Sequence, residues 1–260
     1  MARIGFAASA PFGADVLERL AERHEIAFVL TQPDAPAGRG RGLRPAPGKL
    51  TALKLGLPVV ESLDGPLDAE TIVLVAYGSL VPAALLDRHL WLNVHPSLLP
   101  RWRGAAPVER AIMAGDAETG VTVIKLVEEL DAGPIAAQEA FPIGPADDAG
   151  AVYDRAAESG ARLVEQSLPE PSFTPQPEDG VTYAEKLEAV DRVLDWSRSA
   201  EELERRVRAL SPHIGARAML EGREMTVWKA RVEDGQLVPV EVQPAGGRRM
   251  SYEAWLRGLR

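Results

Sequence analysis

The sequence predicts an α/β fold with a mostly parallel sheet, followed by a smaller β-rich domain. Three observations support this prediction. Short apolar runs alternate with helix-like segments in the first half of the chain. Four prolines between Pro169 and Pro177 interrupt the regular pattern, and Asp234-Gly235 near the end is a hairpin signal between two alternating runs. A chain of 260 residues is long enough to bury the cores of two domains.

The predicted elements follow one another closely along the chain. Buried strands are expected over residues 3–8, 25–31, 71–76 and 91–94, with a later strand pair over 120–127 and 134–141. Helices are expected over residues 15–23, about 146–168 and 200–210, the last capped by Ser199. The hairpin strands are 224–232 and 236–242. This order predicts a first domain over 1–168, a linker or extended crossing segment over 169–194, and a compact second domain over 195–260.

The charge balance by itself argues against a nucleic-acid partner, because 29 basic and 38 acidic residues give a net charge of −9. The segment from 35 to 60, however, has several basic residues and no carboxylate; they are Arg39, Arg41, Arg44, Lys49 and Lys54. Salt screens electrostatic fields beyond about 8 Å, so a local patch matters more than the net charge. A nucleic-acid partner therefore stays open.

Several classes of protein are disfavoured by what the sequence lacks. It has no cysteine, which excludes disulfides and thiolate chemistry, and none of its histidines has metal-ligand spacing, so we expect no metal. No G-x-G-x-x-G follows the first strand, which argues against a dinucleotide enzyme although the sheet is Rossmann-like. The start does not resemble a signal peptide, and no run reaches the roughly 18 apolar residues of a membrane span. We expect a cytoplasmic protein without a membrane partner.

Asn93 and His95 lie at the end of a predicted strand, where ligands bind in open α/β sheets. Strand alternation places both on one side. An amide that holds an oxyanion and an imidazole that moves a proton suit acyl transfer. The alternative is a turn in which both side chains only satisfy backbone groups. Asp131 could orient the imidazole, or it could be an ordinary turn residue, because spacing alone does not decide whether it reaches His95.

Two irregular segments follow predicted strands. Residues 97–107 combine apolar residues, glycine and proline, which fits either a loop over a flat, partly apolar ligand or a loop packed on the sheet edge. Residues 31–45 form an open loop whose arginines could contact phosphates or bases, or simply face solvent.

Motifs along most of the chain resemble those of the 10-formyltetrahydrofolate-dependent formyltransferases, in the family's order. They are TQPDAPAGRGRGLRPAPGK, VAYGSLVP, LNVHPSLLPRWRGAAPVERAI, TGVTVIKLVEELDAGPI, PQPEDGVTYAEKL, DWSRSAEELERRVRALSPHIGA and VQPAGGRRM. The NxHPSLLP segment with a later LDxG is typical of the superfamily. The PAGRG loop and the stretch from GVTYAEKL to RAL are similar to its tRNA-acting branch.

The resemblance implies a Rossmann-like formyltransferase domain joined to a C-terminal OB-like β-barrel. It implies formyl transfer from 10-formyltetrahydrofolate to the α-amine of methionyl initiator tRNA, for translation initiation, without a metal. The implied catalytic residues are Asn93, His95 and Asp131. The implied folate contacts are Ser97, Leu98, Leu99 and Pro100, with Ala76, Tyr77 and Gly78 at a strand end. The implied tRNA contacts are Arg39, Arg41, Arg44 and Lys49.

Two other functions stay open on the sequence alone. The same chemistry could formylate an amino-sugar nucleotide or another small amine, and such an acceptor would need no extended basic surface. The chain could instead be a catalytically silent tRNA- or folate-binding module, although the intact Asn93, His95 and Asp131 argue against this. We expect a monomer.

Overall fold

The computed structural model describes residues 1–37, 42–168 and 170–259, and it divides the chain into two compact units. The first unit contains Met1–Arg103, Gly120–Ala140 and Asp154–Thr182. The second contains Gly104–Thr119, Phe141–Tyr153 and Tyr183–Arg260. Because the chain passes between the units several times, each unit is built from segments that are distant in sequence. The domain boundaries at 168 and 194 stay predictions.

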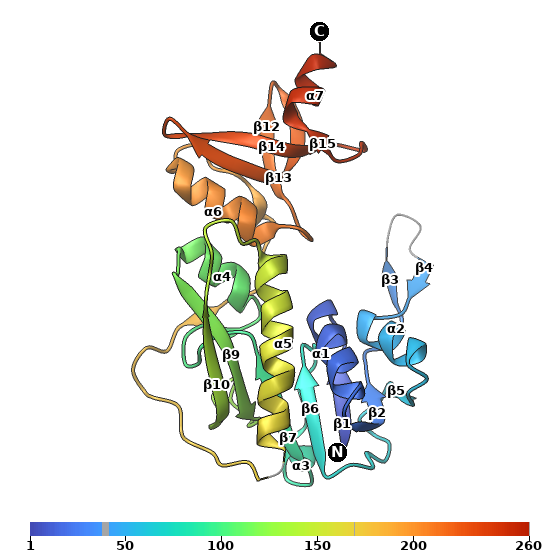
Figure 1. Ribbon diagram of the computed structural model, residues 1–260. Helices are drawn as coiled ribbons and strands as arrows, with labels where there is room; N and C mark the ends of the chain where they lie inside the picture. Colours follow the sequence, from blue (N-terminus) through green and yellow to red (C-terminus); the bar gives the residue numbers. More distant parts are fainter. Residues whose placement is uncertain (38–41, 169, 260) are drawn as a thin grey trace. The chain divides into compact units, whose positions relative to one another are not determined.

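A seven-stranded sheet forms the centre of the first unit, in the order β10-β9-β7-β6-β1-β2-β5 (Figure 1). Its strands are β1 (Arg3–Ala8), β2 (Glu25–Leu30), β5 (Val59–Val60), β6 (Thr71–Val75), β7 (Leu90–His95), β9 (Glu118–Lys125) and β10 (Ile135–Pro142). The pairs β2–β5, β1–β2, β1–β6 and β6–β7 are parallel, whereas β7 and β9 are antiparallel. The predicted mostly parallel sheet is therefore confirmed.

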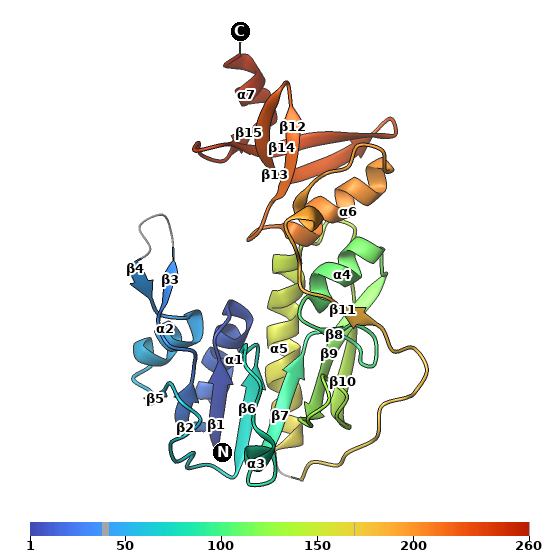
Figure 2. The same ribbon diagram turned by 180° about the vertical axis from the view of Figure 1, so that it is seen from behind.

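Helices α1 (Pro11–Ala21) and α5 (Ala149–Ser167) lie on one face of this sheet, as the two opposite views show (Figures 1 and 2). Helix α1 begins four residues before the predicted start, because Pro11 has the backbone angle that the first helical turn needs. Gly160 lets α5 approach closely, since a Cβ atom there would lie 2.7 Å from Cγ1 of Val94 on β7. Val94 thus faces α5.

The neighbouring positions on β7 face the other side of the sheet. Trp91 packs there with Phe28, Leu74 and Leu67 in a buried cluster, to which Leu85 of the short helix α3 (Ala83–Leu86) adds. Since side chains alternate along a strand, Asn93 and His95 share the face of Trp91, away from α5. This agrees with the predicted alternation.

Smaller elements complete the first unit. Helix α2 (Pro47–Lys54) follows a two-stranded pair, β3 (Ala35–Ala37) and β4 (Gly42–Arg44). Neither α2 nor β5 was predicted from the sequence. A further two-stranded pair consists of β8 (Arg103–Gly104) and β11 (Tyr183–Ala184).

The second unit has an antiparallel sheet with the order β12-β13-β14-β15, so the predicted C-terminal β-rich fold is confirmed. Its elements are α4 (Pro107–Ala114), the short 3₁₀ helix η1 (Val190–Arg192), α6 (Ala200–Leu210), β12 (Ala216–Leu220), β13 (Arg223–Glu233), β14 (Gln236–Pro244), β15 (Met250–Ser251) and α7 (Tyr252–Arg257). Asp234 and Gly235 have φ angles of 49° and 73°, the left-handed pair that a tight hairpin requires, so the predicted hairpin is confirmed.

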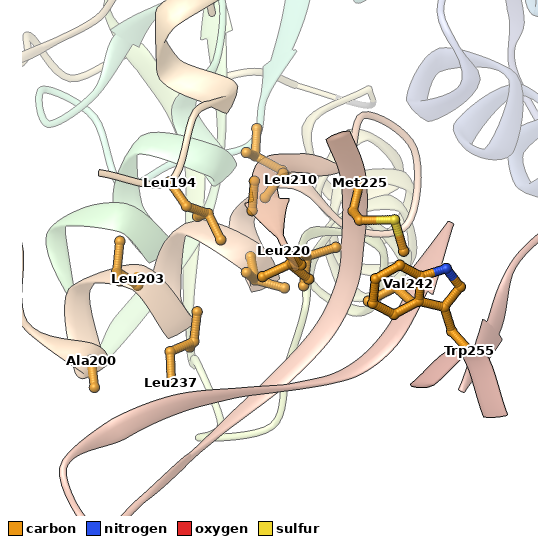
Figure 3. Packing of buried hydrophobic residues seen from close by; sticks show 13 residues of the cluster. Leu194, Ala200, Leu203, Leu210, Leu220, Met225, Leu237, Val242 and Trp255 are labelled. Carbon is orange, nitrogen blue, oxygen red and sulfur yellow. The ribbon is translucent and has the colours of Figure 1, made fainter. Parts of the chain in front are cut away.

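The core of the second unit lies between α6, the sheet and α7. Leu210, Met225, Val242 and Trp255 belong to one buried cluster (Figure 3). Ser199 accepts a hydrogen bond from the amide of Glu202, whose carboxylate accepts one from the amide of Ser199; this capping box fixes the start of α6, as predicted. Among the described residues, no helix is both long and apolar enough to span a bilayer.

Candidate active site

Strand β7 carries two of the predicted catalytic residues to the carboxyl edge of the parallel strands. Asn93 is paired with Leu74 on β6 and with Ile124 on β9, and His95 is the last residue of β7. Both side chains are buried, with exposures of 6% for Asn93 and 5% for His95. A polar group buried this deeply needs partners, so the atoms around these two side chains define the site.

Asp131 lies in the loop between β9 and β10 and reaches both side chains. Nδ2 of Asn93 donates a hydrogen bond to Oδ1 of Asp131 at 3.2 Å, and Nδ1 of His95 lies 3.7 Å from Oδ2. Asp131 itself is 9% exposed. The fold therefore brings together three polar side chains that are up to 38 residues apart in sequence. Their catalytic roles stay predictions.

The tautomer of His95 follows from its second ring nitrogen. Nε2 lies 2.8 Å from the carbonyl oxygen of Trp102. A carbonyl oxygen can only accept, so Nε2 carries the proton and Nδ1 of the neutral ring presents a lone pair. The sequence did not predict this contact with the carbonyl of Trp102. Because of it, the nitrogen with the free lone pair is Nδ1, which faces Asp131.

The loop that carries Ser97, Leu98, Leu99 and Pro100 is held by polar side chains from β9 and β10. The hydroxyl of Thr122 donates to the carbonyl of Ser97 at 2.7 Å and accepts from the amide of Leu99 at 3.1 Å. Gln138 donates to the carbonyl of Leu99 at 3.0 Å and to the Thr122 hydroxyl at 2.8 Å. Sequence reasoning missed Thr122 and Gln138, because a polar residue within a strand carries no local sign of its partner.

Ala76, Tyr77 and Gly78 follow β6, the strand beside β7. The carbonyl of Ala76 accepts from the amides of Ser9 and Ala10, at 3.2 Å each, which ties this strand end to the segment before α1. Tyr77 is buried, and that burial raises the pKa of its hydroxyl. These residues therefore lie at the same sheet edge as Asn93 and His95, as predicted for parallel strands, while their contact with folate stays a prediction.

The four predicted tRNA contacts differ in their surroundings. Arg39 and Arg41 lie outside the described residues, and Arg44 is exposed at the end of β4. Lys49 on α2 forms ion pairs with Asp34 and Glu61, and its side chain is only 17% exposed. Asp34 and Glu61 flank the acid-free segment 35–60 in sequence. The charge of Lys49 is therefore compensated by carboxylates that lie just outside this segment.

Within the described ranges 1–37, 42–168 and 170–259, no group of three or more histidine, aspartate or glutamate side chains could hold a metal ion. The side chains of Asn93, His95 and Asp131 bring one amide, one imidazole and one carboxylate together at this sheet edge. Such a set can donate to a developing oxyanion and move a proton, which is the demand of acyl transfer.

Comparison with known proteins agrees with this class of chemistry. A family model described as formyl transferase matches residues 3–168, and one described as formyl transferase, C-terminal domain, matches residues 186–237. The chain belongs to the formyl transferase family. Among its relatives is the protein named methionyl-tRNA formyltransferase of Dechloromonas aromatica (strain RCB), which is 42% identical, with 97% of this chain and 94% of the relative covered.

Solved structures share the fold. A methionyl-tRNA formyltransferase from Clostridium thermocellum superposes with a TM-score of 0.67 at 13% identity, covering 96% of this chain and 100% of that chain. HypX from Aquifex aeolicus in complex with tetrahydrofolic acid superposes with a TM-score of 0.69 at 20% identity, covering 98% of this chain and 46% of that chain. At these identities the likeness concerns the fold alone.

Proposed function

We propose that this protein transfers the formyl group of 10-formyltetrahydrofolate to the α-amine of methionyl initiator tRNA, for translation initiation. Family membership and a 42% identical relative named methionyl-tRNA formyltransferase support this reaction. The observation that carries the chemistry is the grouping of Asn93, His95 and Asp131 within hydrogen-bonding and ion-pairing distances. No step of this reaction needs a metal.

His95 is proposed to move the proton. A free α-amine titrates near pH 7.7 and an ester lowers that value, so the acceptor amine needs little activation at neutral pH. Once the amine nitrogen bonds to the formyl carbon, it must lose a proton, and the folate nitrogen must gain one as it leaves. Nδ1 of His95 has the free lone pair in the neutral ring, because Nε2 donates to the carbonyl of Trp102. Asp131 at 3.7 Å stabilises the imidazolium while His95 holds the proton.

Asn93 is proposed to stabilise the oxyanion that develops on the formyl oxygen. An amide has two N–H groups, and the bond to Asp131 uses one of them. That bond also fixes the plane of the amide, so the second N–H has a set direction before substrate arrives. A donor oriented in advance at a water-poor site is the arrangement that lowers a charged transition state most.

The loop Ser97–Pro100 and the Ala76–Gly78 strand end are proposed to bind the folate. When bound, 10-formyltetrahydrofolate supplies the formyl carbon that the amine attacks. The residues fit such a ligand, since Leu98 and Pro100 are partly exposed apolar side chains that can pack on a flat ring system, and Leu99 and Tyr77 are buried apolar residues of the same two segments. Thr122 and Gln138 fasten this loop by hydrogen bonds to the carbonyls of Ser97 and Leu99.

The basic loop is proposed to engage the tRNA through Arg39, Arg41 and Arg44, with Lys49 at its base. A small amine such as an amino-sugar nucleotide would need no such loop, so the relatives and the loop together favour tRNA as the acceptor. We further propose that the protein acts as a monomer in the cytoplasm.

The direct test is to incubate the protein with 10-formyltetrahydrofolate and either methionyl initiator tRNA or small amines, including an amino-sugar nucleotide. We expect rapid formylation of the charged tRNA and little of the small amines. Turnover confined to small amines would show that a small amine, and not tRNA, is the acceptor. Absence of turnover with every acceptor would leave the protein only a binding role.

A further inference from the structure

We propose that Gln176 is a positioning residue for Asp131, so that the proline-rich segment after α5 is part of the active site. This inference rests on the proposed function, in which Asp131 stabilises the imidazolium of His95. It assigns to Gln176 an effect on catalysis that acts through the backbone of Asp131, to which Gln176 donates a hydrogen bond.

The side-chain amide of Gln176 links two groups that are far apart in sequence. Its nitrogen Nε2 donates to the carbonyl oxygens of Asp131 at 2.7 Å and of Gly133 at 2.8 Å. Its oxygen Oε1 accepts from Nε and Nη2 of Arg103, at 3.1 and 2.7 Å. All four hydrogen-bonding positions of the amide are therefore used.

Only one orientation of the Gln176 amide satisfies its hydrogen-bond partners. The guanidinium of Arg103 can only donate and the two backbone carbonyls can only accept, so the oxygen must face Arg103 and the nitrogen must face the loop. Arg103 is 7% exposed, and its bonds to Gln176 supply acceptors that a buried cation needs. The contact is thus specific for glutamine and not only for a polar side chain.

The backbone at Asp131 needs such a restraint. Asp131 has a φ angle of +48°, in the left-handed region that residues with side chains rarely adopt. Gly133 follows closely, and a Cβ atom there would lie 1.7 Å from the carbonyl oxygen of Lys125. Two hydrogen bonds from Gln176, one to each of these residues, hold the turn that aims the Asp131 carboxylate at Asn93 and His95.

The segment around Gln176 is itself anchored to the first unit. Thr174 exchanges two backbone hydrogen bonds with Ile135, at 2.7 and 2.9 Å, and Thr182 accepts from the amide of Arg103 at 2.9 Å. Figure 2 shows the segment passing outside the β10 edge of the sheet after it leaves α5. The segment that carries Gln176 is therefore held by hydrogen bonds on both sides of this residue. Gln176 can in turn hold the loop that contains Asp131 and Gly133.

The test uses Gln176→Glu, which keeps the shape and the contact with Arg103 but turns a carboxylate oxygen toward the carbonyls of Asp131 and Gly133. Gln166→Glu, an exposed position on α5, makes the same chemical change as a control. We expect kcat to fall about 10- to 100-fold in Gln176→Glu, the scale of a small misplacement of a catalytic group. The KM for the formyl donor should change far less, and Gln166→Glu should match the wild type.

A double-mutant cycle with Asp131→Asn separates positioning from general destabilisation. If Gln176 acts through Asp131, adding Gln176→Glu to Asp131→Asn lowers kcat little further. Additive losses, or an unchanged kcat in Gln176→Glu, would overturn the inference.

A measurement without substrate distinguishes failure of this inference from failure of the proposed function. Hydrogen exchange of peptides covering residues 126–135 should be faster in Gln176→Glu than in the wild type and in Gln166→Glu. Equal exchange would overturn the proposed restraint, whatever the enzyme formylates. Absence of formyl transfer by the wild type, with faster exchange in Gln176→Glu, would instead count against the proposed function alone.

Discussion

Nε2 of His95 lies 2.8 Å from the carbonyl oxygen of Trp102, which can only accept a hydrogen bond. Nδ1, 3.7 Å from Oδ2 of Asp131, is therefore the nitrogen that has the lone pair in the neutral ring. Trp102 has a φ angle of 63°, and its amide donates to the hydroxyl of Thr182 at 2.9 Å. The proton-carrying nitrogen of the histidine is therefore held by a turn that is restrained in its own right. Asp131 remains available to stabilise positive charge on the ring, because the carbonyl of Trp102 already selects the tautomer.

The first prediction concerns that tautomer. In the neutral ring of His95, nitrogen NMR should show the proton on Nε2 and a bare Nδ1, because a carbonyl oxygen cannot donate. The spectrum of His95→Ala identifies the signal. A neutral ring with its proton on Nδ1 would contradict the assigned proton path.

Loss of the imidazole should remove turnover and spare folate binding. We expect His95→Ala to lower kcat by about 10²- to 10⁴-fold, the usual contribution of a general acid–base group. The affinity for a folate analogue, measured by calorimetry, should stay close to that of the wild type, because the predicted folate contacts lie in residues 97–100 and 76–78. Near-normal turnover in this variant would refute the role of His95.

The sequence predicts the sheet well for a physical reason. Strands such as β6 are buried on both faces, so they appear as continuous apolar runs that a local pattern reveals. Helix α2 was missed because PGKLTALK has little amphipathic pattern, and its Leu50 and Leu53 are exposed. Asn93 and His95 were found because they end such a strand.

Contacts between distant residues could not be predicted in the same way. Asp131 is 36 residues from His95 in the chain, so the sequence offered their meeting only as one of two alternatives until the family resemblance favoured it. Gln176 carries no local signal, since a glutamine between two prolines is typical of a solvated linker. Its partners are set by the return of the chain past β10, which depends on the whole fold of the unit.

The Arg39 side chain should contribute to tRNA binding and not to chemistry. We expect Arg39→Ala to raise the KM for methionyl-tRNA and to reduce the slope of log affinity against log salt by about one, the change expected for one lost phosphate contact. Arg88→Ala removes the same charge from an exposed position before β7 and should behave like the wild type. Unchanged tRNA kinetics at every salt concentration would count against this role of Arg39.

Thr182 should support catalysis through Trp102. Thr182→Val keeps the shape of the side chain but removes the oxygen that accepts from the Trp102 amide. The loss of one hydrogen bond of about 1 kcal/mol should loosen the carbonyl that holds His95, and we expect kcat to fall about fivefold.

Thr174→Val is the matched control on the same segment, because its side chain is exposed and its bonds to Ile135 come from the backbone. Steady-state kinetics of the two variants should therefore differ. Equal kcat values for Thr182→Val and Thr174→Val would show that the Thr182 hydroxyl does not act on the site.

The last prediction concerns stability of the second unit. Glu109 on α4 is 9% exposed and accepts a hydrogen bond from the hydroxyl of Tyr153 at 3.1 Å. Burial raises the pKa of Glu109, and burial together with the nearby carboxylate raises the pKa of Tyr153 well above its usual value. Because the folded state holds the Glu109 proton more tightly than the unfolded chain, the contribution of Glu109 to stability is complete below the unfolded pKa and is lost as pH rises through the folded pKa.

Glu109→Gln keeps an acceptor for Tyr153 and cannot ionise, so its Tm should exceed that of the wild type near pH 7 and approach it near pH 4. Thermal unfolding from pH 4 to 8 measures this difference, with the exposed Glu224→Gln as the control. A constant difference in Tm across that range would mean that Glu109 does not titrate with folding.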